Sequence, residues 1–260
     1  MNIMHVYAVS QKDLKEVFSS PGIYLPMIAI PLLFAIALPA FTVYVSKFAG
    51  PALAERLLKT SVPLGSSTSE VFFMQFFLTN VLGPIFMTMP IITASVIAAD
   101  SFAGEKERKT AESLLSTPIT NKEVLLGKIL SSFLPAVAMT VIIFFVYAGV
   151  ANYSSGKYFD FTLLPNTGWF LMLLTSPFLA LTTIGLVVLV SLRAKGVKEA
   201  QQVSTLLVLP ILVIPFISTF GIAVLTTLFF IELLMILAAT SAIVLALGIK
   251  LFDKERFITA

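Results

Sequence analysis

Cysteine is absent from this chain, and histidine occurs once, as His5. Without cysteine the protein has no disulfide, no thiolate ligand for a metal and no thiol nucleophile, and one histidine is too few for a histidine-based metal site. We therefore predict no catalytic residue and no metal ligand in this chain.

Charged residues are also scarce. They make up 12% of the 260 residues, and hydrophobic residues make up 58%, whereas about a quarter of a typical soluble domain is charged. Several uncharged runs exceed the roughly 20 apolar residues that a helix needs to cross the hydrocarbon core of a bilayer. The composition predicts an all-α integral membrane protein.

The uncharged runs predict six transmembrane helices. Four runs are long enough for one crossing each, and the stretch from Ala200 to Ile249, with Glu232 as its single charge, is long enough for two crossings joined near Gly221. The predicted spans are residues 22–45, 71–99, 127–151, 168–192, 201–220 and 224–249. Residues 1–260 form a single transmembrane domain in this prediction.

The distribution of Lys and Arg predicts the orientation of the helices. With the N-terminus in the cytoplasm, thirteen of the 17 Lys and Arg residues fall in inner segments and four in outer ones, in line with the positive-inside rule. Both termini are predicted to be cytoplasmic, in a multi-pass protein of the cell membrane. The net charge of +3 follows from this distribution, and no Arg-rich groove with interleaved aromatics indicates a nucleic-acid partner.

Residues 3–20, before the first span, predict an amphipathic helix. Ile3, Tyr7 and Phe18 belong to its apolar face, whereas Lys12 and Lys15 belong to the opposite face. A helix of this kind lies in the inner interface of the membrane, in contact with lipid. The alternative is a solvated leader.

The charge that the chain does contain is concentrated between Asp100 and Lys128, in a segment with five acidic and five basic residues. Its composition stays helical until Pro118, and Thr120 with Glu123 forms a capping box that opens the next helix. We predict a cytoplasmic helix in residues 100–118, between the second and third spans, that another protein can bind. A solvated loop with surface salt bridges is the alternative.

The order of residues in this segment resembles the signature of ABC-2 type transporter permeases. The matching run is GEKERKTAESLLSTP from Gly104 to Pro118, followed by Glu123 and then by Gly-Lys at 127–128. Residues 12–16 (KDLKE), 198–202 (KEAQQ) and 252–257 (FDKERF) also resemble the family, so the resemblance covers essentially the whole chain. Lys109 departs from the glycine usual in the family. Glycine readily adopts a positive φ and lysine does so poorly, so this departure bears on the local backbone turn at position 109.

The resemblance implies a half-transporter. In this family two six-helix permeases, either two copies or two related chains, form the path, and two separate cytoplasmic ABC ATPase subunits bind ATP and Mg. The family's coupling helix lies between helices 2 and 3, so the resemblance assigns the ATPase contact to Glu105, Glu107, Arg108, Thr110, Glu112, Leu114 and Leu115. Their implied role is mechanical. Export is the favoured direction, and a drug, a peptide, a lipid, a glycolipid and sodium all remain open as the transported species.

The sequence also indicates that the ATPase is a different subunit. A phosphate-binding loop needs Gly, four residues, Gly-Lys and then Ser or Thr. The Gly-Lys pairs at 127–128 and 156–157 are followed by Ile129 and Tyr158, and neither has glycine five positions earlier. We therefore predict no nucleotide cofactor in this chain and no enzymatic activity.

Glu232 is the only carboxylate inside a predicted span, and an ionisable residue at membrane depth is by default a functional candidate. Two roles are open: a cation or proton site on the transport path, or a structural position near the outer end of the last span, which we favour. The first role suits a self-sufficient ion-coupled secondary transporter, the alternative function. An intramembrane enzyme is a weaker alternative, because paired carboxylates and a Ser–His arrangement at membrane depth are lacking.

Overall fold

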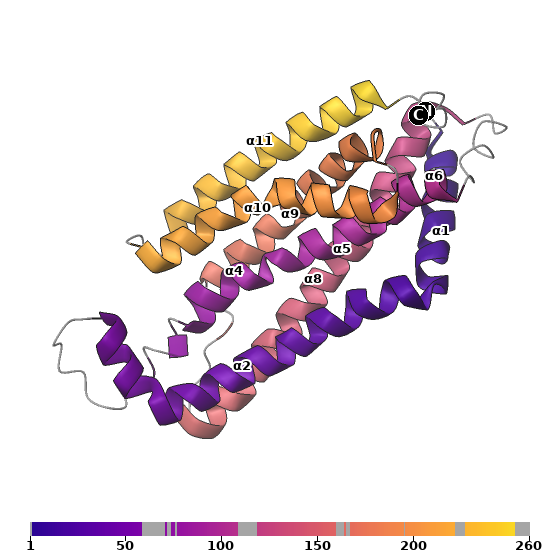
Figure 1. The fold of residues 1–260 in the computed structure, drawn as a ribbon. Helices are drawn as coiled ribbons and strands as arrows, with labels where there is room; N and C mark the ends of the chain where they lie inside the picture. The colour runs from indigo at the N-terminus through magenta and orange to yellow at the C-terminus, as the bar shows by residue number, and fades with distance from the viewer. Residues whose placement is uncertain are drawn as a thin grey trace.

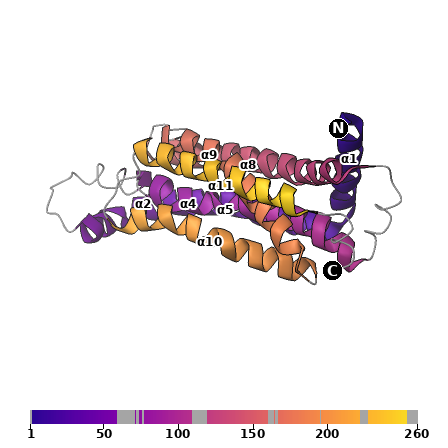
Figure 2. The same cartoon turned by 90° about the horizontal axis from the view of Figure 1, so that it is seen from above.

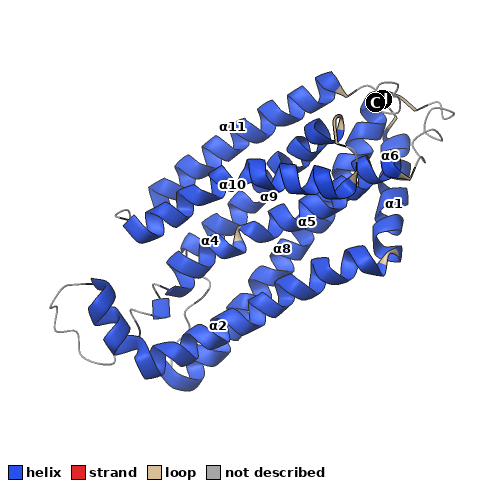
Figure 3. Cartoon of the chain, in the orientation of Figure 1, coloured by secondary structure: helices blue, strands red, loops and turns tan. Residues whose placement is uncertain are grey.

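The computed structural model describes residues 2–58, 71, 74–75, 77–108, 119–159, 164, 167–194, 196–221 and 227–252. Within these ranges all regular secondary structure is helical, and no strand is present (Figure 3). The all-α prediction is confirmed for this part of the chain.

The first helix, α1 (Ile3–Ser19), coincides with the amphipathic helix predicted over residues 3–20. The side chain of Asn2 caps it by accepting a hydrogen bond from the Met4 N–H at 3.0 Å. Ser20 is extended, with φ −106° and ψ 95°, as residues before proline usually are. Pro21 then opens α2 (Pro21–Leu58), at a position where its missing N–H has no helical partner to lose. The Ser20–Pro21 step therefore makes the corner between the two helices.

The helix α2 extends well past the first predicted span, residues 22–45. The part that is long and apolar enough to cross a membrane is Met27–Phe48, and the helix continues to Leu58. The prediction stopped just before the first charge, Lys47. A charge marks where a membrane crossing ends, but the backbone hydrogen bonds of a helix can continue beyond it.

The second span is a series of short helical segments. In order they are η1 (Phe77–Val81), α4 (Leu82–Phe86), α5 (Thr88–Ala99), η2 (Asp100–Gly104) and α6 (Glu105–Glu107), of which η1 and η2 are π-helical turns. The membrane-crossing part, Leu82–Glu107, is shifted toward the C-terminus relative to the predicted range 71–99. It continues through Asp100 and Glu105 because both charges have partners: Arg108 pairs with Asp100, and Lys12 and Lys128 of other helices pair with Glu105.

Four long helices complete the described chain: α8 (Asn121–Phe159), α9 (Thr167–Ser191), α10 (Val197–Gly221) and α11 (Thr227–Leu251). They contain or closely overlap the predicted spans 127–151, 168–192, 201–220 and 224–249. The predicted capping box before α8 is confirmed. The Thr120 N–H donates to Glu123 Oε2 at 3.0 Å, and the Glu123 N–H donates to Thr120 Oγ1 at 3.4 Å.

The long helices run alongside one another, and α1 lies across one end of the bundle (Figure 1). Seen from above, α1 lies at the same end as the charged segment around α6 (Figure 2). Phe252, the last described residue, contacts Phe102 of η2 with ring centroids 6.1 Å apart. The described chain thus begins and ends at one end of the bundle, which we call the α1 end.

Five segments of the described chain are long and apolar enough to cross a membrane: Met27–Phe48, Leu82–Glu107, Asn121–Lys157, Thr167–Ser191 and Leu228–Leu251. These segments support a multi-pass membrane protein. The 25-residue helix α10 is not among the five.

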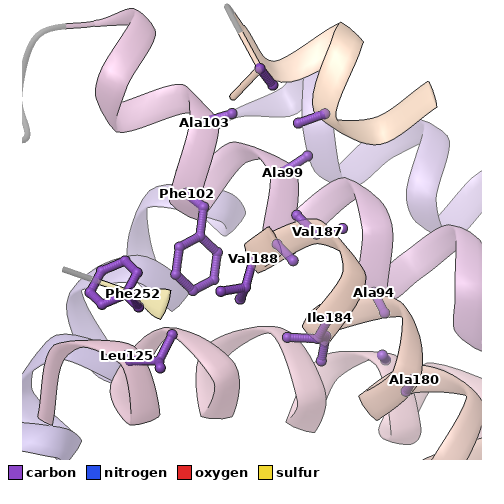
Figure 4. Packing of buried hydrophobic residues seen from close by; sticks show 14 of the residues in the cluster. Ala94, Ala99, Phe102, Ala103, Leu125, Ala180, Ile184, Val187, Val188 and Phe252 are labelled. Carbon is purple, nitrogen blue, oxygen red and sulfur yellow. The ribbon is translucent and has the colours of Figure 1, made fainter. Parts of the chain in front are cut away.

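Two large apolar clusters lie along the described part of the bundle. At the α1 end, Phe102, Leu125, Val188 and Phe252 pack together (Figure 4). Farther along, an aromatic cluster centres on Trp169, whose ring stacks on Tyr147 at 4.5 Å between centroids. Both clusters draw on several helices, so the bundle packs as a single unit.

A glycine allows α9 and α11 to approach closely. These two helices share the most extensive contact in the described chain, and a Cβ on Gly185 would lie 2.7 Å from Val244 Cγ1. Small residues at such positions are typical of packed membrane helices, which gain stability from close van der Waals contact.

Gly185→Leu should therefore destabilise the bundle. The larger side chain would force α9 and α11 apart, and overpacking of this kind costs about 1–3 kcal/mol. We expect a lower thermal unfolding midpoint for the detergent-purified protein. Gly149→Leu is the matched control, since a Cβ on Gly149 meets nothing within 4 Å, and equal losses for the two variants would contradict the packing argument.

Candidate functional site

Charged side chains converge at the α1 end, where α1, the η2–α6 segment and the start of α8 meet. Four carboxylates and three cations form linked ion pairs there. They are Asp13, Glu16, Asp100 and Glu105, with Lys12, Arg108 and Lys128. We call these seven residues the charge cluster.

Lys128 of α8 lies at the centre of the charge cluster, with its side chain 1% exposed. Its Nζ donates to the Ser101 carbonyl at 2.5 Å and lies 2.7 Å from Glu105 Oε2 and 3.5 Å from Asp13 Oδ2. The ring of Phe102 lies near it, 5.5 Å from Nζ to the ring centroid, a distance at which an aromatic face attracts a cation. Burying an ammonium group is costly without such partners. Lys128 therefore links α8 to both α1 and η2.

Three side-chain pairs also join α1 directly to the end of the second span. The pairs are Lys12–Glu105, Asp13–Ser101 and Glu16–Arg108. The Ser101 hydroxyl donates to Asp13 Oδ2 at 2.5 Å, and Arg108 Nη2 donates to Glu16 Oε1 at 2.9 Å. Because the three pairs follow one side of α1, they fix the direction of the helix as well as its position.

Two glycines provide the space for these contacts. A Cβ on Gly104 would lie 2.9 Å from both Arg108 Nη2 and Asp100 Oδ1, and these two side chains form an ion pair of 2.9 Å. A Cβ on Gly127 would lie 2.7 Å from Val9 Cβ and 2.9 Å from a backbone oxygen of α1. In the Gly-Lys pair at 127–128, Gly127 thus lets α1 approach α8 closely, and Lys128 supplies the cation that pairs with Asp13 of α1.

The N-terminal end of α1 is held separately by Glu123 at the start of α8. The Asn2 N–H donates to Glu123 Oε1 at 2.5 Å, and His5 Nδ1 lies 3.4 Å from Glu123 Oε2. The same carboxylate completes the capping box of α8. Glu123 therefore joins the first turns of two helices that are far apart in the sequence.

Glu107 connects the charged segment to α10. Its carboxylate Oε2 accepts a hydrogen bond from the Val197 N–H at 3.0 Å, and negative charge at a helix N-terminus is favourable because the first N–H groups have no partner within the helix. A Cβ on Gly196 would lie 2.8 Å from the same oxygen. The end of the second span therefore contacts α1, α8 and α10.

The charge cluster stabilises the protonated form of Lys12. Burial acts to lower the pKa of this ammonium group, but the hydrogen bond and the negative charge of Glu105 outweigh that effect, and Asp13 and Glu16 add to it. The pKa of Lys12 is therefore raised above its ordinary value. The pKa of Arg108 is likewise raised, chiefly by its hydrogen bond to Asp100.

The predicted coupling residues lie in different surroundings. Glu105 is 2% exposed and holds Lys12 and Lys128, so it does not offer its carboxylate at the surface of this structure. Glu107 is exposed, and the Arg108 side chain is 41% exposed. The other four lie outside the described residues: Thr110, Glu112, Leu114 and Leu115.

Glu232 lies in the first turns of α11, away from the charge cluster. It is exposed, as are Leu228 and Met235 on the same helix. No group of three or more Asp, Glu or His side chains within the described ranges is arranged to hold a metal ion.

Sequence reasoning missed the central role of Lys128, Asp13 and Ser101. Lys128 and Asp13 both lie in segments that resemble the ABC-2 signature, but the positive-inside rule treats a lysine at the end of a span only as an orientation signal. Their contacts join residues 88 and 115 positions apart. Periodicity along one helix carries no information on such pairs.

A family model described as ABC-2 family transporter protein matches residues 7–248. The chain belongs to this family. The resemblance found in the charged segment is therefore confirmed, and the charge cluster lies in an ABC-2 transporter protein with several membrane-crossing helices.

One relative of this ABC-2 protein is the ABC transporter permease protein NatB of Bacillus subtilis (strain 168). The two are 30% identical over 136 residues, which are 50% of this chain and 35% of NatB. The matched region thus spans about a third of the length of that relative. Together with the family match, it supports a membrane permease of an ABC transporter.

Lys128→Met tests whether the buried cation holds α1. Methionine keeps an unbranched side chain but leaves Asp13 and Glu105 buried without this partner, and breaking a buried ion pair typically costs about 3–5 kcal/mol. We expect much faster amide hydrogen exchange in α1 of the purified variant. Lys15→Met, on the exposed side of α1, should leave exchange unchanged.

The double variant Lys128→Met with Glu105→Gln provides the internal check. Removing both charges should recover part of the lost protection in α1, since the uncompensated carboxylate is gone. Additive losses would mean that Lys128 and Glu105 act independently.

Proposed function

We propose that this chain is the membrane-spanning subunit of an ATP-driven exporter that works with separate cytoplasmic ABC ATPase subunits. The observation that carries the mechanical part of the proposal is that the charged end of the second span is bonded to α1, α8 and α10. A force applied to this end reaches three helices at once.

In this proposal the subunit has six transmembrane helices, with α10 as the fifth. The first residue of α10 is bonded to Glu107 at the α1 end, and the last described residue after α11 packs there on Phe102. A chain that starts and ends at one end of the bundle needs an even number of crossings, and the five apolar segments together with α10 make six. Both termini are then cytoplasmic, as the Lys and Arg distribution favours.

We assign α1 to the inner membrane interface. Ile3, Tyr7 and Phe18 are 77%, 63% and 51% exposed, whereas Asp13 is buried against the charge cluster. An exposed apolar face on a helix that is anchored to the protein through the buried Asp13 fits a lipid surface. Lys15, also exposed, then lies toward the headgroups and water.

The ATPase contact is assigned to the segment that directly follows Arg108. Thr110, Glu112, Leu114 and Leu115 supply that contact in this proposal, together with Glu107 and Arg108. Glu105 has an indirect role, because its buried carboxylate holds Lys12 and Lys128. Six of the seven predicted residues thus form the proposed contact surface, and Glu105 anchors that surface to the helices.

The working unit in this proposal is a pair of permeases, either two copies or this chain with a related one, and two ATPases that bind ATP and Mg. ATP binding closes the ATPases and pushes on the end of the second span. The charge cluster transmits the push to α1 and α8, and Glu107 transmits it to α10. The helices tilt, and the path changes the side to which it opens. Glu232, exposed on α11, has a structural role in this scheme.

The position of α1 can be tested by fluorescence quenching with brominated phosphatidylcholine in reconstituted vesicles. Tyr7→Trp should be quenched strongly above the background of the native Trp169. Lys15→Trp, about 80° around the helix from position 7, should be quenched less. Equal quenching at the two positions would rule out a lipid-facing orientation of the apolar side.

The coupling surface can be tested by co-purification with a candidate ATPase. Glu107→Lys combined with Glu112→Lys reverses two charges in the proposed contact, so we expect loss of the ATPase from the purified complex and loss of ATP-driven transport. Lys157→Glu, near the far end of α8, is the control and should retain both. Normal transport by the double variant would show that the contact lies elsewhere.

A further inference from the structure

A cavity of about 370 Å³ lies at the α1 end, outside the charge cluster except at one edge. It lies between α2, α5 and α10 and is bounded at one end by η2. The residues that line it are Gly22, Met27, Ile30 and Pro31 of α2, Ile92 and Val96 of α5, Asp100 of η2, and Val197 and Gln201 of α10.

The cavity has the size and shape of a small-molecule site. The helix α5 contacts both α2 and α10, so it forms the floor and the other two helices form the walls. From Ile92 to Asp100 the floor extends about 12 Å at the helical rise of 1.5 Å per residue. The volume falls in the range of about 300–1,000 Å³ that ligand pockets occupy.

The polar groups of the cavity gather at one end. Met27, Ile30 and Ile92 make its walls apolar, and Asp100 is the single charged residue among the described residues that line it. Gln201 adds an amide that both donates and accepts hydrogen bonds. A ligand with one polar end and one apolar end matches this division.

The carboxylate of Asp100 retains capacity for a further hydrogen-bond donor. Its Oδ1 accepts from Arg108 Nη1 at 2.9 Å, but Oδ2 lies 3.5 Å from Nη2, and a carboxylate offers about four acceptor positions. Arg108 also serves Glu16, so one guanidinium is shared by two carboxylates. Because two carboxylates share one guanidinium, the charge around Asp100 favours a cationic donor over an anion.

We propose that this cavity binds an amphiphile with a protonated amine on an apolar chain, the amine at Asp100 and Gln201 and the chain between α2 and α10. An anionic head would be repelled by Asp100, and a purely apolar ligand would leave the carboxylate and the amide facing hydrocarbon. This proposal rests on the proposed exporter function, because it names the class of molecule that the exporter carries.

The location of the cavity gives the amphiphile a route from the membrane. Ile30 and Ile92 at its edge are 52% and 38% exposed, on the outer surface of the bundle. Near the start of α2, Gly22 also leaves open space beside the cavity, because a Cβ at this position meets nothing within 4 Å. With the α1 end at the cytoplasmic side, the cavity lies at the level of the inner leaflet, where an amphiphile orients its head toward Asp100.

Photoaffinity labelling of the permease alone tests binding without any ATPase. The probe is dodecylamine with a diazirine at the end of its chain, applied to the full chain in phosphatidylcholine nanodiscs. We expect labelled peptides from α2 and α5 around the cavity. Unlabelled dodecylamine should compete with the probe, whereas dodecanol should compete about tenfold less well and dodecanoate should not compete.

Two tryptophan variants separate the cavity from the surrounding lipid surface. Ile30→Trp fills the cavity from its wall and should reduce labelling about tenfold. Leu33→Trp is the matched control, since Leu33 is 62% exposed on the same helix but does not line the cavity, and it should label as the native chain does. Equal labelling of both variants would overturn the proposal.

Asp100→Asn tests the charge without changing the shape. It should abolish the preference for dodecylamine over dodecanol while the α2 and α5 peptides are still labelled. If the preference survives, Asp100 does not select the amine and the proposed ligand class is wrong.

Stimulation of ATP hydrolysis in the complex with the partner ATPase then distinguishes the two proposals. Site-specific labelling without stimulation would support the cavity and count against its ligand being the cargo. Stimulation by dodecylamine that persists in Ile30→Trp would support the exporter and count against this cavity.

Discussion

The arrangement of helices at the α1 end depends on neutralising one buried cation, Lys128. Its ammonium group is surrounded by Glu105, Asp13 and the carbonyl of Ser101. An ammonium group at this depth requires such partners, and they come from α1 and from the π-helical turn η2. The position of α1 across the bundle is therefore tied to the position of a charge on α8.

Different forces act along the length of the bundle. Over most of the described bundle the helices meet through apolar side chains and small residues such as Gly185, with single polar links such as the hydrogen bond from the Tyr147 hydroxyl to the Leu78 carbonyl. At the α1 end, ion pairs add directional links between α1, η2 and α8. In the proposed exporter, force enters at the α1 end, where these directional contacts are concentrated, and the mainly apolar contacts elsewhere allow the helices to tilt.

Much of the helical fold was predictable from charge and hydropathy. Scarce charge predicted long apolar helices, and three of the six predicted ranges agree within a few residues with α9, α10 and α11, whereas α8 extends beyond its predicted range at both ends. The helix ends that the sequence predicts less accurately have a common cause. The predicted limits fall at the charges Lys47 and Asp100, whereas α2 continues to Leu58 and the second apolar segment continues to Glu107. Asp100 pairs with Arg108 of the same segment, and Glu105 pairs with Lys12 and Lys128 of distant segments. Hydropathy along one segment registers neither pairing.

The sequence by itself determined the class of the protein, its helical segments, the capping box at Thr120 and the family signature, because each depends on residues close together in the chain. Only the tertiary structure decided that Lys128 and Glu105 are buried partners, that Glu107 caps α10, and that Asp100 borders a cavity between α2 and α10. These features arise where separate helices meet. The energy of a charge depends on what surrounds it in space, and that surrounding exists only once the helices have packed.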